Sequence, residues 1–377
     1  MKTPDVIVRG KDNGEGMVIH YETTRGTDIF GLAMPNIYAN TDWDLGPTWC
    51  YLVIGQKITL VDTGRFGNFE VFRTLLKLTG KEFSDIDRII ITHSHEDHDG
   101  NLAEILSVAQ AELWAHAIYR QMISYHRHIE DGAQHPELPG SCRLCNMPES
   151  FYRNCLPYHK KRSSLSIDFV VEDAQTLPDN DLSFIFTPGH TPDSICIILE
   201  NEVIFTGDTI LPEITPHPSL TYAFEVNHRI LPERYQQKNI VYGLMNYIKS
   251  LNKIVSLTSQ PLQATFPAHR LFYNGQFNLI HSSSDRAKEI IQFHIDRCRD
   301  ILNILDNKPA SIEEIAIQHF PASQLKGTGK SLAKNEIMAH IEIMEKCGDI
   351  CWTGENRDIV QHTGSNKYLN IIGTYLY

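Results

Sequence analysis

Thr92-His93-Ser94-His95-Glu96-Asp97-His98-Asp99-Gly100-Asn101 is the stretch on which the fold and chemistry of this chain depend. It follows the apolar run Ile89-Ile90-Ile91, so a predicted strand delivers three histidines and several carboxylates at its carboxyl end. His93 and His95 are two positions apart, and in extended backbone such side chains project to the same side. Asp97 and His98 lie past the strand end, where a turn carries them to a second point. So many ligands suit two metal ions a few ångströms apart better than one catalytic ion with open positions.

His-x-His-x-Asp-His-x-Gly resembles the signature of the metallo-β-lactamase fold superfamily of hydrolases. That family takes further groups from other strand ends, and four more segments of this chain fit in the expected order. They are Leu60-Val61-Asp62-Thr63-Gly64, Thr187-Pro188-Gly189-His190-Thr191, Val203-Ile204-Phe205-Thr206-Gly207-Asp208-Thr209 and Thr265-Phe266-Pro267-Ala268-His269. The resemblance spans about residues 45–270.

The resemblance implies an α/β fold, an αββα sandwich with a two-metal centre at one edge. It implies two sets of metal ligands joined by a bridging aspartate: His93, His95 and His190 for one ion, Asp97, His98 and His269 for the other, and Asp208 between them. Asp62 is expected just behind the ions, where a carboxylate orients the ligand loop. Zinc is the expected metal for both positions, and iron or manganese would accept the same ligands.

The same resemblance implies a mechanism. A water bridging two cations has a lowered pKa, which supplies a metal-bridged hydroxide at neutral pH without a serine or cysteine nucleophile. Asp97 and His98 are the expected catalytic residues. Asp97 is either a pure ligand or the group that takes up the proton after attack.

Composition sets the class of protein. A chain of 377 residues is too long for one ordinary core. We therefore expect a catalytic domain over 1–280 and a helical linker with a winged-helix domain over 281–377. No apolar run reaches the roughly 18 residues of a membrane helix, and residues 1–5 lack the apolar segment of a secretory signal. A cytoplasmic protein with eight reduced cysteines is expected. The net charge of −12 argues against nonspecific attraction to nucleic acid or membrane.

Residues 116–165 form an insertion without clear periodicity, a candidate cap over the site. It holds seven Lys/Arg against four acids, so it could attract an anionic substrate or be a positively charged surface loop. It also contains C-x2-C and C-x3-H patterns, whose ligand types suit a structural third zinc ion: Cys142, Cys145, Cys155 and His159. Reduced cysteines without a metal, or redox use, are the alternatives.

The C-terminal region shows helical spacing over 285–305, a capping box at Ser311 and Glu314, and then a helix, helix, β-hairpin pattern. This pattern is typical of a winged-helix module. The whole chain thus resembles the group of β-lactamase-like protein 2 and related thioesterases. That group includes a mitochondrial single-strand endoribonuclease and thioesterases acting on polyketide or acyl carriers.

The charge of the module bears on nucleic-acid binding. Residues 309–377 hold six Lys/Arg and eight acids, a net charge of −2, which is poor for contacts to a phosphate backbone. Three lysines could still line one edge of the second helix: Lys326, Lys330 and Lys334. A structural role, or closure of a substrate channel, is favoured.

Hydrolysis of an ester or thioester, such as an acyl-CoA or acyl-carrier, is therefore the leading function. The basic insertion suits a small anionic substrate. The alternative is a single-strand endoribonuclease, supported by its relative and weakened by the acidic module. A regulator with a vestigial core is disfavoured because the ligand set is intact. A homodimer is left open, as is whether His217 donates to the substrate or lies at the surface. A long helix is expected over 235–251.

Overall fold

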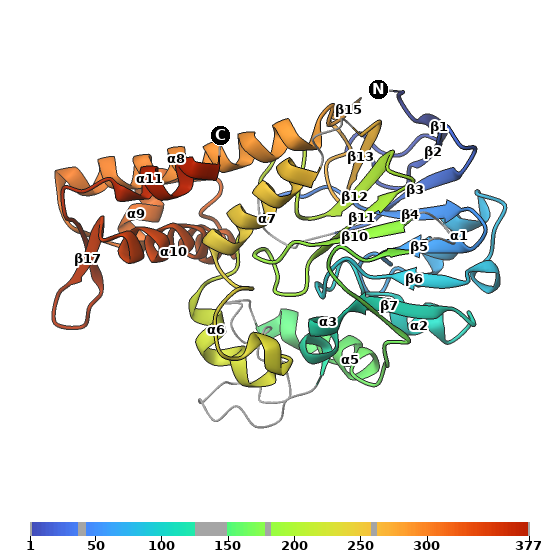
Figure 1. The fold of residues 1–377 in the computed structure, drawn as a ribbon, viewed down its shortest axis with the longest axis horizontal. Coiled ribbons are helices and arrows are strands. Elements are labelled where there is room, and N and C mark those ends of the chain that lie inside the picture. Colours follow the sequence, from blue (N-terminus) through green and yellow to red (C-terminus); the bar gives the residue numbers. More distant parts are fainter. Residues whose placement is uncertain (1, 37–42, 125–148, 178–181, 258–261, 376–377) are drawn as a thin grey trace.

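The chain was analysed as a computed structural model, which describes residues 2–36, 43–124, 149–177, 182–257 and 262–375. Two β-sheets pack face to face, and helices cover both outer faces (Figure 1). The first sheet has eight strands in chain order, antiparallel from β1 to β5 and parallel from β5 to β8. These strands are β1 (Asp5–Val8), β2 (Val18–Glu22), β3 (Asp28–Met34), β4 (Thr48–Ile54), β5 (Ile58–Val61), β6 (Arg88–Ile90), β7 (Glu112–His116) and β8 (Phe169–Val171).

The second sheet has the strand order β13-β12-β11-β10-β9. Among its described strands, β12 and β13 pair in parallel and the other neighbours pair antiparallel. Its strands are β9 (Thr176–Leu177), β10 (Leu182–Phe186), β11 (Ile195–Leu199), β12 (Val203–Gly207) and β13 (Ala264–Pro267). A separate hairpin of β14 (Phe272–Tyr273) and β15 (Gln276–Phe277) follows.

Alternation of side chains along the strands builds the layers. In β4, Trp49 and Tyr51 enter the core between the sheets, whereas Cys50 and Leu52 enter the core under the first helical layer. That layer consists of α1 (Phe69–Lys77), α2 (Leu102–Leu106) and α3 (Ala117–Ile123). The predicted αββα sandwich is confirmed.

The outer face of the second sheet carries α7 (Leu244–Leu257) and α8 (Ser283–Asn307). The prediction of a helix over 235–251 is wrong at its start, because the observed helix α7 begins only at Leu244. Gly243 has φ +95°, which a right-handed helix does not accept, and the Asn239 side chain accepts hydrogen bonds from the backbone N–H of Val241 and Tyr242. These contacts form a turn, and α7 starts after it.

The C-terminal module contains the predicted helix, helix, β-hairpin order in α9 (Ile312–His319), α10 (Gly329–Cys347), β17 (Ile350–Thr353) and β18 (Ile359–His362). Two further elements, β16 (Ala310–Ser311) and α11 (Lys367–Ile372), were not predicted. The strands form a small sheet of order β16-β18-β17. The capping box of Ser311 and Glu314 is present at the start of α9. This element order is the one on which the winged-helix prediction rests.

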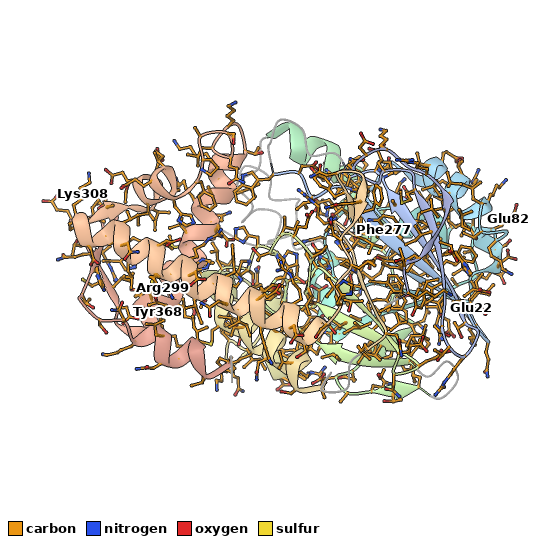
Figure 2. The ribbon with its side chains drawn as sticks, turned by 90° about the horizontal axis from the view of Figure 1, so that it is seen from above. Glu22, Glu82, Phe277, Arg299, Lys308 and Tyr368 are labelled. Carbon is orange, nitrogen blue, oxygen red and sulfur yellow. The ribbon has the colours of Figure 1, made fainter. Side chains whose placement is uncertain are left out.

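One hydrophobic core runs from the second sheet through α7 and α8 into this module. It joins Ile204 of β12 to Ile291 and Leu302 of α8 and to Ile337 of α10. Seen from above, α8 extends from the sandwich toward the end of the molecule where Arg299, Lys308 and Tyr368 lie, with Glu22 and Glu82 at the opposite end (Figure 2). The domain boundary at residue 280 stays a prediction.

Part of the insertion is helical although the sequence shows no clear periodicity there. The helices α3 and α5 (Glu149–Arg162) flank residues 125–148, which lie outside the described part. Within the described ranges, every helix is too short or too polar to cross a bilayer.

Candidate metal centre

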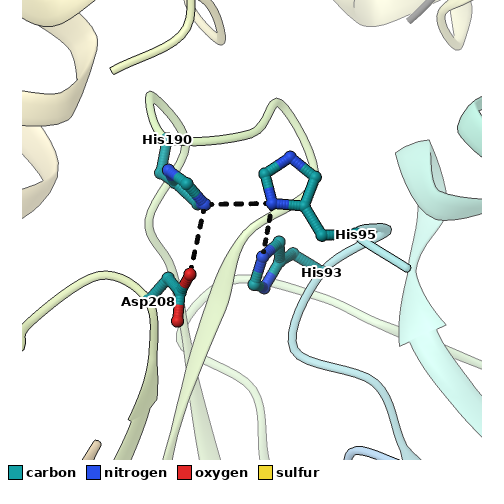
Figure 3. Close-up of side chains that lie close together, drawn as sticks. All are labelled: His93, His95, His190 and Asp208. Atoms are coloured by element: carbon teal, nitrogen blue, oxygen red, sulfur yellow. Dashed lines mark hydrogen bonds and ion pairs between the residues drawn. The ribbon is translucent and has the colours of Figure 1, made fainter. Parts of the chain in front are cut away.

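Segments that follow β6, β10 and β12 bring a first group of side chains together. Figure 3 shows its members pointing toward one another: His93, His95, His190 and Asp208. Nδ1 of His95 lies 3.1 Å from Nε2 of His93 and 3.2 Å from Nε2 of His190. Nε2 of His190 lies 3.4 Å from Oδ2 of Asp208. Three imidazoles and a carboxylate thus converge on one point.

A second group lies on the other side of Asp208 and contains Asp97, His98 and His269. Nε2 of His269 lies 3.3 Å from Oδ2 of Asp97 and 3.3 Å from Oδ1 of Asp208. Nε2 of His98 lies 3.4 Å from the same Oδ1. Asp208 therefore presents one oxygen to each group. All seven predicted ligands meet here, and their roles as ligands stay predictions.

The hydrogen bonds of the histidines fit metal ions in both groups. Nδ1 of His98 donates to the carboxylate of Asp62 at 2.8 Å. Nδ1 of His190 donates to the carbonyl of His217 at 2.7 Å, and Nδ1 of His269 donates to the carbonyl of Pro47 at 3.2 Å. Each Nε2 then carries its lone pair toward the centre, as in metal-binding histidines. Three buried atoms of these two groups have no hydrogen-bond partner among the described residues: His98 Nε2, His269 Nε2 and Asp208 Oδ1. Cations between the groups would satisfy them.

Asp62 contacts the second group through His98. Its carboxylate accepts from the backbone N–H of Thr92 at 2.8 Å, from the Thr92 hydroxyl at 2.7 Å and from His98 Nδ1. Its backbone is left-handed, with φ 60°, a conformation that aspartate and asparagine tolerate better than most residues. Asp62 thus ties the end of β5 to the metal loop.

Burial and neighbouring charges set the protonation of these groups. Burial, with His98 and His95 adding, lowers the pKa of His93 well below its usual value, and burial with His190 lowers the pKa of His95 to about 3. Burial disfavours the carboxylate of Asp208, but His269 and His98 outweigh it and hold the pKa of Asp208 well below its usual range. These shifts favour neutral imidazole at His93 and His95 and ionised carboxylate at Asp208, the forms that bind metals.

Comparison with known proteins agrees with this geometry. The profile of the Metallo-beta-lactamase superfamily matches residues 43–259. The chain belongs to this superfamily. It is similar to the probable metallo-hydrolase YqjP of Bacillus subtilis, with 24% identity over 84% of this chain and 92% of that protein. It is also similar to the atrochrysone carboxyl ACP thioesterase of Aspergillus fumigatus, with 25% identity over 67% of this chain and 58% of that protein.

Among solved structures, a metallo-beta-lactamase family protein of Thermus thermophilus, TTHA1429, has a TM-score of 0.64 at 22% identity. The match covers 89% of this chain and 98% of that protein. The structural match therefore includes most of the residues that lie outside 43–259, the range of the superfamily profile. This likeness concerns the fold.

The superfamily motifs do not contain every residue that contacts the centre. Oδ2 of Asp97 accepts from Asn36 Nδ2 at 2.7 Å and from the Thr48 hydroxyl at 3.2 Å. Neither residue stands in a motif, so the sequence held no signal for them. His217 contributes its backbone carbonyl to His190, while its own Nδ1 donates to the Pro218 carbonyl at 2.6 Å. Both roles that the sequence left open for the His217 side chain stay predictions.

Helix α5 of the insertion is bound by an ion pair and hydrogen bonds to the loop 93–100, which carries His93, His95, Asp97 and His98. The buried Arg162 pairs with the buried Asp99 at 2.8 Å and donates to the carbonyl of Ser94 at 2.9 Å. Tyr119 and Tyr158 also donate to Asp99. The described part of the insertion is therefore adjacent to the metal loop, and its role as a cap stays a prediction.

The predicted cysteine site is only partly described. Cys142 and Cys145 lie outside the described residues. Cys155 and His159 are both buried on α5, and burial together with Arg162 lowers the pKa of His159 to about 2. A structural zinc ion at these four residues stays a prediction.

Proposed function

We propose that this metallo-hydrolase is a two-metal enzyme that uses zinc and cleaves an acyl thioester, such as an acyl-CoA or acyl-carrier. The observation that carries the two-metal part is Asp208, with one oxygen toward each group of ligands. Metal ions bound there would supply a hydroxide at neutral pH and polarise the carbonyl under attack.

The residues of the chain would orient these groups and handle the proton. Asp62 and Thr92 hold His98, so its Nε2 faces Asp208. Asn36 and Thr48 hold Oδ2 of Asp97 at the wall of the centre. After attack, a proton would pass to this Asp97 carboxylate, whose Oδ2 lies 3.3 Å from Nε2 of His269.

Two observations favour a thioester over RNA. A relative that matches 67% of this chain is named as an acyl-carrier thioesterase. In the C-terminal module, Lys330 and Lys334 pair with Glu313 at 2.7 and 3.6 Å, which reduces the positive charge available to a phosphate backbone. The basic composition of the insertion gives less support for an anionic substrate than its count of lysines and arginines suggests. Arg162 already pairs with Asp99, and Lys161 pairs with Glu104.

The test compares three substrates on the same protein: an acyl-CoA thioester, the matching oxygen ester and a single-stranded RNA. Chelator treatment should abolish thioester cleavage, and zinc should restore it. A His95→Ala/Asp208→Ala variant should lose nearly all activity. His20→Ala is the matched control, because His20 pairs with Asp28 on neighbouring strands outside the centre. Cleavage of RNA alone would replace the thioesterase proposal by the nuclease, and full activity of the double variant would end both.

The number of bound ions tests the metal assignment independently of substrate. The two groups predict two zinc ions per chain. A third ion that disappears in Cys142→Ser/Cys145→Ser would add the structural site of the insertion. One ion or none in the wild-type protein would contradict the two-metal centre.

A further inference from the structure

The segment 217–222 joins the metal centre to α10 of the C-terminal module. We propose that Glu342 of α10 is a positioning residue for the metal centre: it fixes this segment, and the segment fixes the ring of His190. The inference rests on the proposed role of His190 as a metal ligand. It gives the C-terminal module a specific part in metal binding.

On the inner side, the segment holds the turn that carries His190. The carbonyl of His217 accepts from His190 Nδ1 at 2.7 Å, which orients Nε2 toward His95 and Asp208. Ser219 donates both its backbone N–H and its hydroxyl to the carbonyl of Gly189, each at 2.7 Å. Three hydrogen bonds thus set the position of the turn and the rotation of the ring.

The turn has little freedom to adjust by itself. Gly189 has φ +133°, and a Cβ at this position would lie 2.3 Å from backbone atoms of Tyr247 in α7. The Ser219 hydroxyl also accepts from the backbone N–H of Gly243, just before α7. The His190 turn is therefore packed between α7 and the segment, and a shift of the segment changes the contact that aims the imidazole.

On the outer side, α10 holds the same segment. The Glu342 carboxylate accepts from the backbone N–H of Thr221 at 2.6 Å and of Tyr222 at 3.0 Å. These groups stand at the start of α6 (Tyr222–Asn227), where backbone donors lack partners within the helix. One carboxylate therefore anchors the segment by two charge-assisted hydrogen bonds, which are stronger than neutral ones.

A buried polar cluster holds α10 in place next to this contact. Glu336 pairs with Arg297 of α8 and lies 3.8 Å from Nδ1 of His217. His340 Nδ1 donates to the carbonyl of Glu336, and His294 of α8 lies 3.0 Å from His340 Nε2. Glu336, His340 and His294 have metal-binding side chains. Arg297 already neutralises Glu336, however, so a divalent ion would leave buried charge without compensation. The cluster is better explained as a link between α8 and α10.

The experiment measures the affinity of each of the two zinc ions by competition with a chromophoric chelator. Glu342→Ala should weaken one ion by about tenfold, the low end of the usual cost of losing a group that orients a ligand. Glu342→Gln keeps one acceptor oxygen and should lose less. Glu345→Ala is the matched control for charge, because Glu345 lies on the same helix and pairs with the exposed Arg357. His190→Ala marks which ion belongs to the His190 group.

The outcomes separate the inference from the function on which it rests. Selective weakening of the ion that His190→Ala removes, with the other ion unchanged, supports the positioning role. Equal weakening of both ions, with a matching fall in melting temperature of the metal-free protein, would indicate general destabilisation and overturn it. Unchanged affinity in Glu342→Ala beside a loss in His190→Ala would overturn the inference alone. Two tightly bound ions in His190→Ala would overturn the ligand assignment as well.

Discussion

On the proposed metal assignment, Asp62→Asn should weaken zinc binding at His98 without altering the backbone. Asparagine accepts the left-handed conformation of position 62, where φ is 60°. Its amide oxygen can still accept from the Thr92 N–H, but its NH2 group then faces His98 Nδ1, where the carboxylate oxygen accepts at 2.8 Å. The amide NH2 group and the N–H of His98 Nδ1 would then be two hydrogen-bond donors facing each other. His98 would have to move its proton to Nε2, the atom aimed at the centre.

The expected magnitude follows from the hydrogen bonds that the Asp62 carboxylate makes. Removing a group that orients a metal-bound histidine costs roughly 10–100-fold in metal affinity, or about 1.4–2.7 kcal/mol. Two of the three hydrogen bonds to the buried carboxylate are weakened as well, those from His98 Nδ1 and from the Thr92 hydroxyl. Such bonds contribute roughly 1.5–3 kcal/mol each to stability when one partner is charged. We therefore expect weaker zinc binding together with a lower melting temperature.

The assay is zinc titration of the metal-free protein, beside a control that loses stability but keeps the centre. Asp349→Asn serves, because Asp349 is also fully buried and accepts three hydrogen bonds, from Ser365 Oγ and the backbone N–H of Lys367 and Tyr368. Both variants should unfold at lower temperature, and only Asp62→Asn should bind zinc more weakly. Equal zinc affinity in the two variants would refute the orienting role of Asp62.

Three further variants test the surroundings of the centre. Gly207→Ala places a Cβ 2.8 Å from Thr92 Oγ1 at φ +49°, so thermal denaturation should show a loss of about 1–3 kcal/mol and zinc titration a weaker complex. Burial raises the pKa of Asp193 from 3.8 to about 6, so the folded protein holds this proton more tightly than the unfolded chain. The contribution of this group to the free energy of unfolding is fully present below about pH 4 and is lost as the pH rises through about 6. In urea unfolding, the stability of metal-free Asp193→Asn should therefore depend less on pH than that of the metal-free wild type. Arg162→Leu leaves Asp99 buried without its cation and should cost about 3–5 kcal/mol in urea unfolding, part of which Asp99→Asn/Arg162→Leu should recover.

The grouping of the candidate metal ligands could be predicted from sequence because five short segments, each after an apolar strand, match the motifs of a known family. His190 and Asp208 follow strands that run in the same direction in the second sheet, so the ends of these strands meet at one edge. His93 follows a strand of the first sheet, and the resemblance implied its place beside the other two. Helix α8 and the capping box of Ser311 were predictable for a similar reason, since periodicity and capping depend on near neighbours.

Contacts that depend on packing between distant segments were not predictable. Asn36 and Thr48 reach Asp97 only because of how their segments lie beside the metal loop, and no local pattern marks them. The start of α7 was misplaced because apolar spacing continues upstream through a turn fixed by Gly243 and Asn239. The partners of Lys330 and Arg162 likewise needed three-dimensional contacts, although composition gave their charge correctly.

Helix α8 has a consequence for how the molecule comes apart. Its 25 residues run about 38 Å without interruption, and buried side chains along it belong to the same core as the second sheet and α10. A chain cut at residue 280 would expose the apolar stripe of α7 on one fragment and that of α8 on the other. The two parts share one hydrophobic core and should therefore melt in one cooperative transition.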